Sequence, residues 1–344
     1  MKKIKEIEII RGVLILIIVF FHYTYRFTEL FKIETINFFS LNNWGIIGVG
    51  CFFIITGYFI VPKKMENYDI RKFITKKILR IYPSYALCVT IIFISIKLFG
   101  LEGRETNFID YLLNLTLING IIDTKYIDGA HWYITYLITF YIIVGLILKL
   151  TKKSEIYVII WLIIKDIVKI VTKFIPNSLI IYRLIGGDYV EFIVIGIVLN
   201  SIIKIKEEDM CNIYNLLKMK LIHWYFLIIM ISLFQIAITR GIIVIIGIMI
   251  FLMILLILLF KEQKEILILT PLYYIGDMSF VLYLIHQNIG YQILLKLYNL
   301  GFGFKFIYVI ITLLIILFIS YIIDRLFEKR VQRIIREKLK KGAN

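Results

Sequence analysis

The hydrophobic positions of the chain fall into ten stretches with few charged residues, separated by polar segments. Most of these stretches are about 18–20 residues long, which is the length that crosses a bilayer as an α-helix. The predicted spans are 10–27, 44–61, 81–99, 132–148, 156–175, 188–203, 221–239, 241–260, 267–289 and 306–323. The runs are continuous rather than alternating, which excludes a membrane β-barrel. The span at 156–175 is the weakest, because Lys165, Asp166 and Lys169 interrupt it.

Composition supports a membrane protein. Of the 344 residues, 60% are hydrophobic and 19% are charged, and the mean hydropathy is +0.89. Soluble domains average roughly 45–50% apolar and about 25% charged residues. These values exclude a soluble enzyme, a secreted disulfide scaffold and a disordered protein. They predict an all-α, polytopic protein whose single membrane-embedded domain occupies residues 1–344.

The charge distribution predicts the orientation. The chain has 40 Lys and Arg against 24 Asp and Glu, which on a soluble protein would suggest a nucleic-acid partner. If the N-terminus is cytoplasmic, the inner segments carry 27 basic residues, the outer side carries 12 with the charges of span 156–175 included, and Arg11 lies within the first span. Basic residues collect in cytoplasmic loops, so we expect both termini inside and no nucleic-acid partner. Two inner termini require an even number of spans, which supports ten.

The two ends of the chain are basic. The first residues resemble a signal peptide, but no small-residue cleavage site follows, so we expect an uncleaved first span. Residues 324–344 carry apolar residues at helical spacing and predict an amphipathic helix on the anionic inner leaflet, in contact with membrane lipids. The cysteines Cys51, Cys88 and Cys211 are far apart, and the sequence offers no plausible metal-ligand cluster.

Arg11 and His22 are the most informative charged and titratable residues within a span. They are eleven positions apart, which is about 20° more than three helical turns, so they share one helix face. Ionisable groups at membrane depth are costly and indicate function by default. His22 near mid-membrane is suited to accept a proton from a hydroxyl, and Arg11 at the inner rim is suited to hold a phosphate or carboxylate. The alternative is a snorkelling arginine and a structural histidine.

Further polar groups lie near the ends of other spans. Arg80 sits at the same inner rim as Arg11, where it is suited to an anionic cofactor or serves as an ordinary positive-inside anchor. Ser279, Tyr283 and His286 form a polar stripe at i, i+4 and i+7, for binding or for helix association. His131 and Trp132 open the fourth span at the outer face, either lining a cavity or forming part of the aromatic belt. His223 is expected to be an interfacial anchor.

Glycines and missing motifs narrow the function. Gly45, Gly48, Gly50 and Gly57 in the second span predict close helix packing, with a substrate channel as the alternative. The sequence has no phosphate-binding GxxxxGK[ST] loop and no GxSxG nucleophile motif. ATP-driven transport and serine-hydrolase chemistry are therefore not expected.

Six segments, in order, resemble motifs of the acyltransferase-3 family of integral membrane acyltransferases. They are IIRGVLILIIVFFHY with Arg11 and His22, GVGCFFIITGYFI, KKILRIYPSY with Arg80, Tyr82 and Pro83, GAHWYITYLITFY with His131 and Trp132, IGDMSFVLYLIHQ with Ser279, Tyr283 and His286, and FEKRVQR with Glu328. The chain departs from the family pattern at Thr56 in place of Ser, at Lys77 in place of the first arginine, and at Arg330 in place of Pro. His131 and Trp132 are adjacent here.

The resemblance implies an acyl transfer. Such enzymes are understood to take an acyl group, usually acetyl, from cytosolic acyl-CoA as co-substrate, with no bound cofactor, and to deliver it to a hydroxyl of a saccharide or lipid-linked saccharide. His22 would be the general base or would carry the acyl group. Arg11 would be the second catalytic residue. The donor and acceptor would be bound by Arg80, Lys77, Tyr82, Ser279, Tyr283, His286, His131 and Trp132. The excess of Lys over Arg, 29 to 11, suggests an AT-rich bacterial genome and hence the cell membrane of a bacterium.

Two other classes of function remain open from the sequence. A transporter of a saccharide precursor or small metabolite would suit many helices with buried polar groups, but it should have internal repeats and Gly- or Pro-broken helices. The four prolines all lie near span ends or in loops. A non-catalytic membrane partner in surface-polymer assembly would leave the Arg11 and His22 pair unexplained. The oligomeric state is open.

Overall fold

A computed structural model of the chain describes residues 5–33, 41–62, 68–151, 155–175, 178–207, 214–260, 269–301 and 305–341. These residues form helices joined by short connections, and none of them forms a strand. The predicted all-α class is therefore confirmed. Residues 267–268 of the ninth predicted span, residues 342–344 of the tail and Cys211 lie outside the described residues.

The helices fall into two compact units. The first unit comprises residues 1–48, 78–133 and 253–344, and the second comprises 49–77 and 134–252. The first contains α1 (Lys5–Phe21), η1 (His22–Arg26), α2 (Phe27–Phe31), η2 (Leu41–Asn43), α5 (Phe108–Leu115), η3 (Gly129–His131), α12 (Thr270–Asp277), α13 (Ser279–Asn299), α14 (Lys305–Ile323), η7 (Asp324–Glu328) and α15 (Lys329–Lys341). The second contains α7 (Glu155–Val171), α8 (Leu179–Leu184), η5 (Gly187–Tyr189), α9 (Val190–Glu207) and α10 (Tyr214–Arg240). Residues of α3 (Trp44–Ile60), α4 (Ile70–Phe99), α6 (Trp132–Thr151) and α11 (Ile242–Phe260) belong to both.

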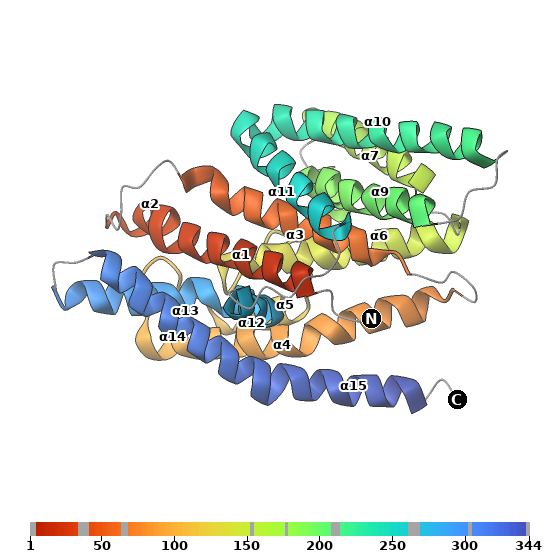
Figure 1. Cartoon of the computed structure of the whole chain (residues 1–344). Helices are drawn as coiled ribbons and strands as arrows, with labels where there is room; N and C mark the ends of the chain where they lie inside the picture. The colour runs from red at the N-terminus through yellow and green to blue at the C-terminus, as the bar shows by residue number, and fades with distance from the viewer. Residues whose placement is uncertain are drawn as a thin grey trace. The chain divides into compact units, whose positions relative to one another are not determined.

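In the first unit, α1 packs against α12. In the same unit, α13 packs along α14 (Figure 1). Two glycines bring the backbones of α1 and α12 into contact. A Cβ atom at Gly12 would lie 2.1 Å from the carbonyl oxygen of Leu272, and one at Gly276 would lie 1.7 Å from that of Glu8. No larger side chain fits at either position without moving the helices apart, so the sequence fixes how closely α1 and α12 pack.

The helix α13 is the buried centre of the first unit. From Ser279 to Gln292 every side chain except that of Phe280 is buried. The predicted single span 267–289 is wrong in its continuity, because the chain turns at Met278 and a new helix runs on to Asn299. Polar side chains within a membrane face the protein interior rather than lipid, which explains why so polar a helix lies at the centre.

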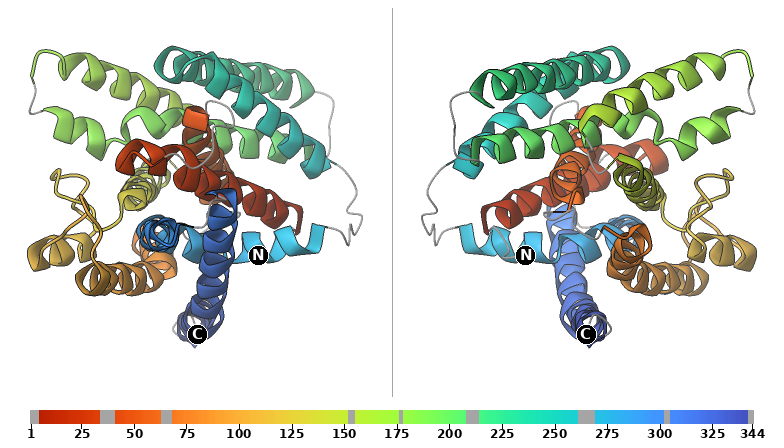
Figure 2. Two further views of the ribbon diagram at one scale, coloured as in Figure 1. Left: turned by 90° about the vertical axis from the view of Figure 1, so that its left-hand side faces the viewer. Right: turned by 90° about the vertical axis from the view of Figure 1, so that its right-hand side faces the viewer.

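In the second unit, α9 packs against both α10 and α7 (Figure 2). A Cβ atom at Gly57 would lie 2.2 Å from the carbonyl oxygen of Ile193, and one at Gly196 would lie 2.0 Å from that of Ile54. A Cβ atom at Gly50 would lie 2.6 Å from the Phe192 ring, and in the first unit one at Gly45 would lie 2.7 Å from Phe21 and one at Gly48 would lie 2.6 Å from Ile18. The predicted packing role of the glycines in span 44–61 is confirmed.

Seven helices among the described residues are long and apolar enough to cross a membrane. They are Lys5–Phe31, Ile70–Phe99, Gly129–Thr151, Leu179–Lys204, Leu221–Arg240, Ile242–Leu259 and Lys305–Leu339. The chain is thus a multi-pass membrane protein. Three predicted spans are not among them: α3 and α7 have 17 residues each, and the ninth is divided between α12 and α13. Ten spans and cytoplasmic termini remain predictions.

Candidate functional site

Three of the four histidines contribute to one polar cluster in the first unit. The rings of His22 and His286 stand edge to face with 4.9 Å between their centroids. The ring of His131 reaches the same helix, α13, where its Nε2 lies 2.8 Å from the carbonyl oxygen of Leu284. His131 and His286 are fully buried, whereas His22 is partly exposed. His22 is therefore the ring that a substrate can reach most directly.

His22 begins a turn of π-helix between α1 and α2. The backbone N–H of Phe27 donates to the carbonyl oxygen of His22, five residues earlier, which widens this turn. Such π-turns occur frequently at functional sites. Nδ1 of His22 shares a hydrogen bond of 3.1 Å with the hydroxyl of Tyr291 on α13. The side that carries Nδ1 is thus occupied by protein.

His286 and His131 each have one nitrogen bonded to a backbone carbonyl. Nδ1 of His286 lies 2.8 Å from the carbonyl oxygen of Tyr283. Because a carbonyl oxygen can only accept, Nδ1 of His286 and Nε2 of His131 carry the protons. The other nitrogens, Nε2 of His286 and Nδ1 of His131, are buried with no hydrogen-bond partner among the described residues. Each neutral ring therefore has an unused lone pair that can accept a proton.

A buried carboxylate organises the surroundings of these rings. Asp128 is fully buried and accepts hydrogen bonds of 2.9 Å from the backbone N–H groups of Ala130 and Asn288. Its charge acts on both His131 and His286. The Tyr23 hydroxyl donates to the carbonyl oxygen of His286 at 2.8 Å. These bonds tie the short η3 segment and η1 to the same part of α13.

A second group of predicted residues surrounds Arg11 and Arg80. Arg11 forms an ion pair of 3.1 Å with Glu8 and interacts electrostatically with Arg80. The side chain of Arg80 is exposed, and its backbone carbonyl accepts from Gln332 Nε2 at 2.8 Å. Ser84, one turn further on, donates to Glu328. The two arginines that the sequence assigned to one rim thus act on each other electrostatically, and Arg80 is exposed.

The remaining predicted residues have different environments. The ammonium group of Lys77 lies 5.5 Å from the ring centre of Phe73 and 4.9 Å from that of Tyr141. Tyr283 donates to the carbonyl oxygen of Ala130 at 2.6 Å. The other three are placed as follows: Tyr82 is exposed, Ser279 is buried with its hydroxyl unpartnered among the described residues, and Trp132 begins α6 beside Tyr133. The full burial of His131 argues against a place in an aromatic belt.

Comparison with protein families adds an independent finding. The family model described as "Acyltransferase domain", that of the acyltransferase-3 family, matches residues 4–325 of the 344. The chain belongs to the acyltransferase-3 family. This match includes residues of both units and covers the first five resembling segments, and it ends just before the sixth, at residues 327–333. In comparisons with curated proteins and with solved structures, nothing matches the acyltransferase.

Sequence reasoning missed several residues of the acyltransferase's histidine cluster. Tyr291 continues the row of Tyr283 and Gln287 at intervals of four, but the predicted span ended at Ile289. Asp128 and Arg104 lie in the segment between α4 and α6, where no periodicity indicates an inward-facing residue. Arg104 acts electrostatically on His22. No group of three or more His, Cys, Asp or Glu in the described part of the chain is placed to hold a metal ion.

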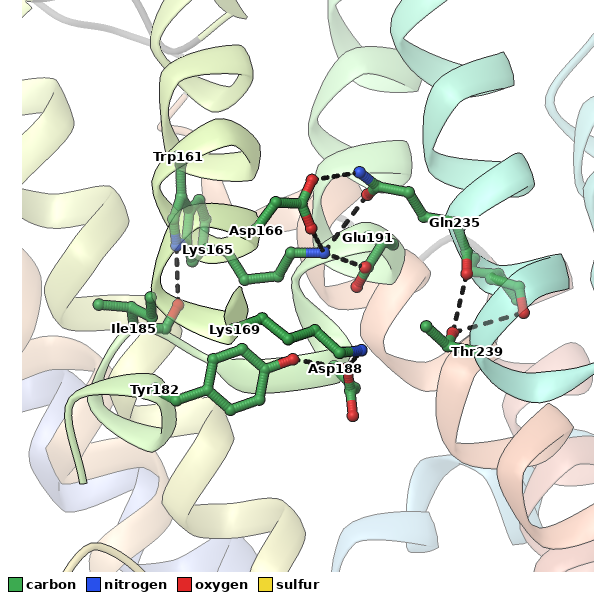
Figure 3. Close-up of polar contacts among 11 residues, drawn as sticks. Trp161, Lys165, Asp166, Lys169, Tyr182, Ile185, Asp188, Glu191, Gln235 and Thr239 are labelled. Atoms are coloured by element: carbon green, nitrogen blue, oxygen red, sulfur yellow. Dashed lines mark hydrogen bonds and ion pairs between the residues drawn. The ribbon is translucent and has the colours of Figure 1, made fainter. Parts of the chain in front are cut away.

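The second unit of the acyltransferase has a polar cluster of its own (Figure 3). The Lys165 ammonium lies between two carboxylates, 2.5 Å from Glu191 and 2.7 Å from Asp166. Gln235 on α10 donates to Asp166 at 2.5 Å. Lys165 and Glu191 are both 1% exposed, so the two charges compensate each other away from water. The charges that weaken the predicted span 156–175 are therefore largely paired.

Proposed function

We propose that the protein transfers an acetyl group from cytosolic acetyl-CoA to a hydroxyl of a cell-surface saccharide or of its lipid-linked precursor. The reaction would take place in the cell membrane of a bacterium. Membership of the acyltransferase-3 family supports the acyl transfer. The basic residues near the predicted inner face support an anionic donor such as CoA, because guanidinium groups bind phosphates with charge-assisted hydrogen bonds.

The donor is bound by the basic rim. The accessible guanidinium of Arg80 meets a phosphate group of CoA, and Arg11, oriented by Glu8, adds a second positive charge. Lys77 and Tyr82 on α4 also contribute to binding of the donor. The acceptor lies against the histidine cluster, among Trp132, His131, Ser279, Tyr283 and His286.

His22 acts as the general base. It removes the proton from the acceptor hydroxyl, whose oxygen attacks the carbonyl carbon of the thioester. The carbon–sulfur bond breaks, the acyl group stays on the acceptor oxygen, and the CoA thiolate takes up the proton that His22 removed from the acceptor. The unpartnered Nε2 of His286 supplies a second basic nitrogen beside His22.

The observation that carries this proposal is the partly exposed His22 ring beside a buried second imidazole. We expect membranes that contain the protein to transfer label from acetyl-labelled acetyl-CoA to their endogenous acceptor. His22→Ala should abolish the transfer at unchanged abundance, since a positioned general base contributes about 10²–10⁴ in rate. His223→Ala removes an exposed imidazole on α10 and should leave transfer intact. Solute uptake without label transfer would favour a transporter instead.

A further inference from the structure

Tyr291 is held rigidly behind the His22 ring. Its side chain is fully buried, and its ring packs against those of Phe27 and Phe31, with centroid distances of 5.7 and 5.5 Å. Its hydroxyl lies 3.1 Å from Nδ1 of His22. A tyrosine fixed by two aromatic neighbours presents its hydroxyl at one place, so the partner ring is fixed as well.

Gln287 supports the same hydroxyl from one turn earlier on α13. Its Nε2 donates to the Tyr291 oxygen at 3.3 Å, and the Gln287 side chain is 2% exposed. Residues four apart lie on the same helix face, which is how both side chains point toward η1. Gln287, Tyr291 and His22 therefore form a hydrogen-bonded chain that ends on Nδ1.

This row of hydrogen-bonded side chains occupies Nδ1 of His22 and leaves Nε2 as the other ring nitrogen. A hydroxyl can donate one hydrogen bond and accept two. If Nδ1 carries the proton and donates it to Tyr291, the lone pair of the neutral ring is on Nε2. Asp128, the buried carboxylate of this cluster, is occupied by the backbone N–H groups of Ala130 and Asn288. The group that contacts Nδ1 of His22 and orients its ring is therefore the hydroxyl of Tyr291 rather than a carboxylate.

We propose that Tyr291 is a positioning residue that fixes the His22 ring and its tautomer, making Nε2 the reacting nitrogen. Gln287 acts through Tyr291 and not on the substrate. This inference rests on the proposed function of His22. It predicts that removing the Tyr291 hydroxyl slows the chemical step without weakening the binding of the donor.

The test measures label transfer from acetyl-CoA at varied acetyl-CoA concentration, in membranes with a fixed amount of endogenous acceptor and equal amounts of folded protein. Tyr291→Phe should lower kcat by roughly 5- to 100-fold, the range for one hydrogen bond at a buried group, and leave the KM for acetyl-CoA unchanged. Gln287→Leu should lower kcat less. In the Tyr291→Phe background it should have no further effect, because Gln287 acts through the missing hydroxyl.

Tyr298→Phe is the matched control. Tyr298 lies on the same helix and stacks on Phe27 at 5.8 Å, but its buried hydroxyl has no hydrogen-bond partner among the described residues. We expect this variant to keep the wild-type kcat. The inference is overturned if Tyr291→Phe has the same kcat as Tyr298→Phe, or if Tyr291→Phe changes the KM for acetyl-CoA instead of kcat. It is also overturned if the losses in kcat from Gln287→Leu and Tyr291→Phe add in the double variant. If instead His22→Ala retains wild-type transfer, the proposed function itself fails.

Discussion

Arg80 gives the clearest prediction about binding of the acyl donor. Arg80→Ala should raise the KM for acetyl-CoA, because a phosphate loses a charge-assisted partner worth roughly 1.5–3 kcal/mol, a factor of about 10–150. Arg80→Lys should restore binding only in part, since an ammonium group lacks the planar fork of a guanidinium. Initial rates of label transfer at varied acetyl-CoA concentration measure both.

Lys76→Ala provides the matched control. Lys76 is an exposed cation on α4, one turn before Arg80, so its removal changes the local charge equally. We expect an unchanged KM for this variant. A wild-type KM for both Arg80 variants would show that Arg80 is only an anchor at the membrane surface.

Residues of the site could be predicted from the sequence where an ionisable side chain stands within an apolar span. Arg11, His22 and His286 are conspicuous because ionisable groups are rare within apolar spans. Tyr291 was not conspicuous, since a tyrosine near a span end is typical of the membrane interface. Asp128 lies in a segment without periodicity, and only the tertiary packing brings it beneath α13.

At the scale of helices, α7 depends on the pairing of its buried charge. Lys165→Met leaves the 1% exposed Glu191 without its ammonium partner, and we expect a loss of about 3–5 kcal/mol in stability. Adding Glu191→Leu should restore much of that loss, because no buried unpaired charge then remains; Asp166, the other partner of Lys165, is 42% exposed. Thermal unfolding of the purified protein in detergent measures these differences.

Lys169→Met tests whether burial is the reason that Lys165→Met destabilises the protein. Its pair with Asp188, in the same part of the second unit, is 37% and 32% exposed (Figure 3). Exposed pairs are typically worth about 0–1 kcal/mol, so this variant should unfold near the wild-type temperature. Equal losses for Lys165→Met and Lys169→Met would contradict the account of α7.

The bounds of helices were predicted best where the sequence is most continuously apolar. The runs at 81–99 and 221–239 fall within long helices of the structure, and the run at 241–260 matches α11 from its first residue, Ile242. The predicted span 267–289 fails because its polar residues face a protein interior that the sequence pattern does not reveal. Its break at Met278 and its extension to Asn299 follow from packing against α1, η3 and α14 rather than from hydropathy.

At the scale of the whole molecule, the distribution of Lys and Arg predicts the topology. Reporter fusions after Asn43 and after Asn119 should be external, and fusions after Asn67 and at the C-terminus should be internal, because the 27-to-12 bias places the basic segments in the cytoplasm. Activity of a reporter that works on only one side of the membrane measures each position. An external C-terminal reporter would overturn both the orientation and the even number of spans.

The central claim is that His22 provides base chemistry in an acyl transfer. The most direct measurement compares label transfer from acetyl-CoA by the wild-type protein and by His22→Gln, at equal amounts of folded protein. Glutamine keeps a similar size and a hydrogen bond to Tyr291 but cannot take up and release a proton. We predict loss of transfer by a factor of about 10²–10⁴. Transfer by His22→Gln at the wild-type rate would contradict the role of His22 as base.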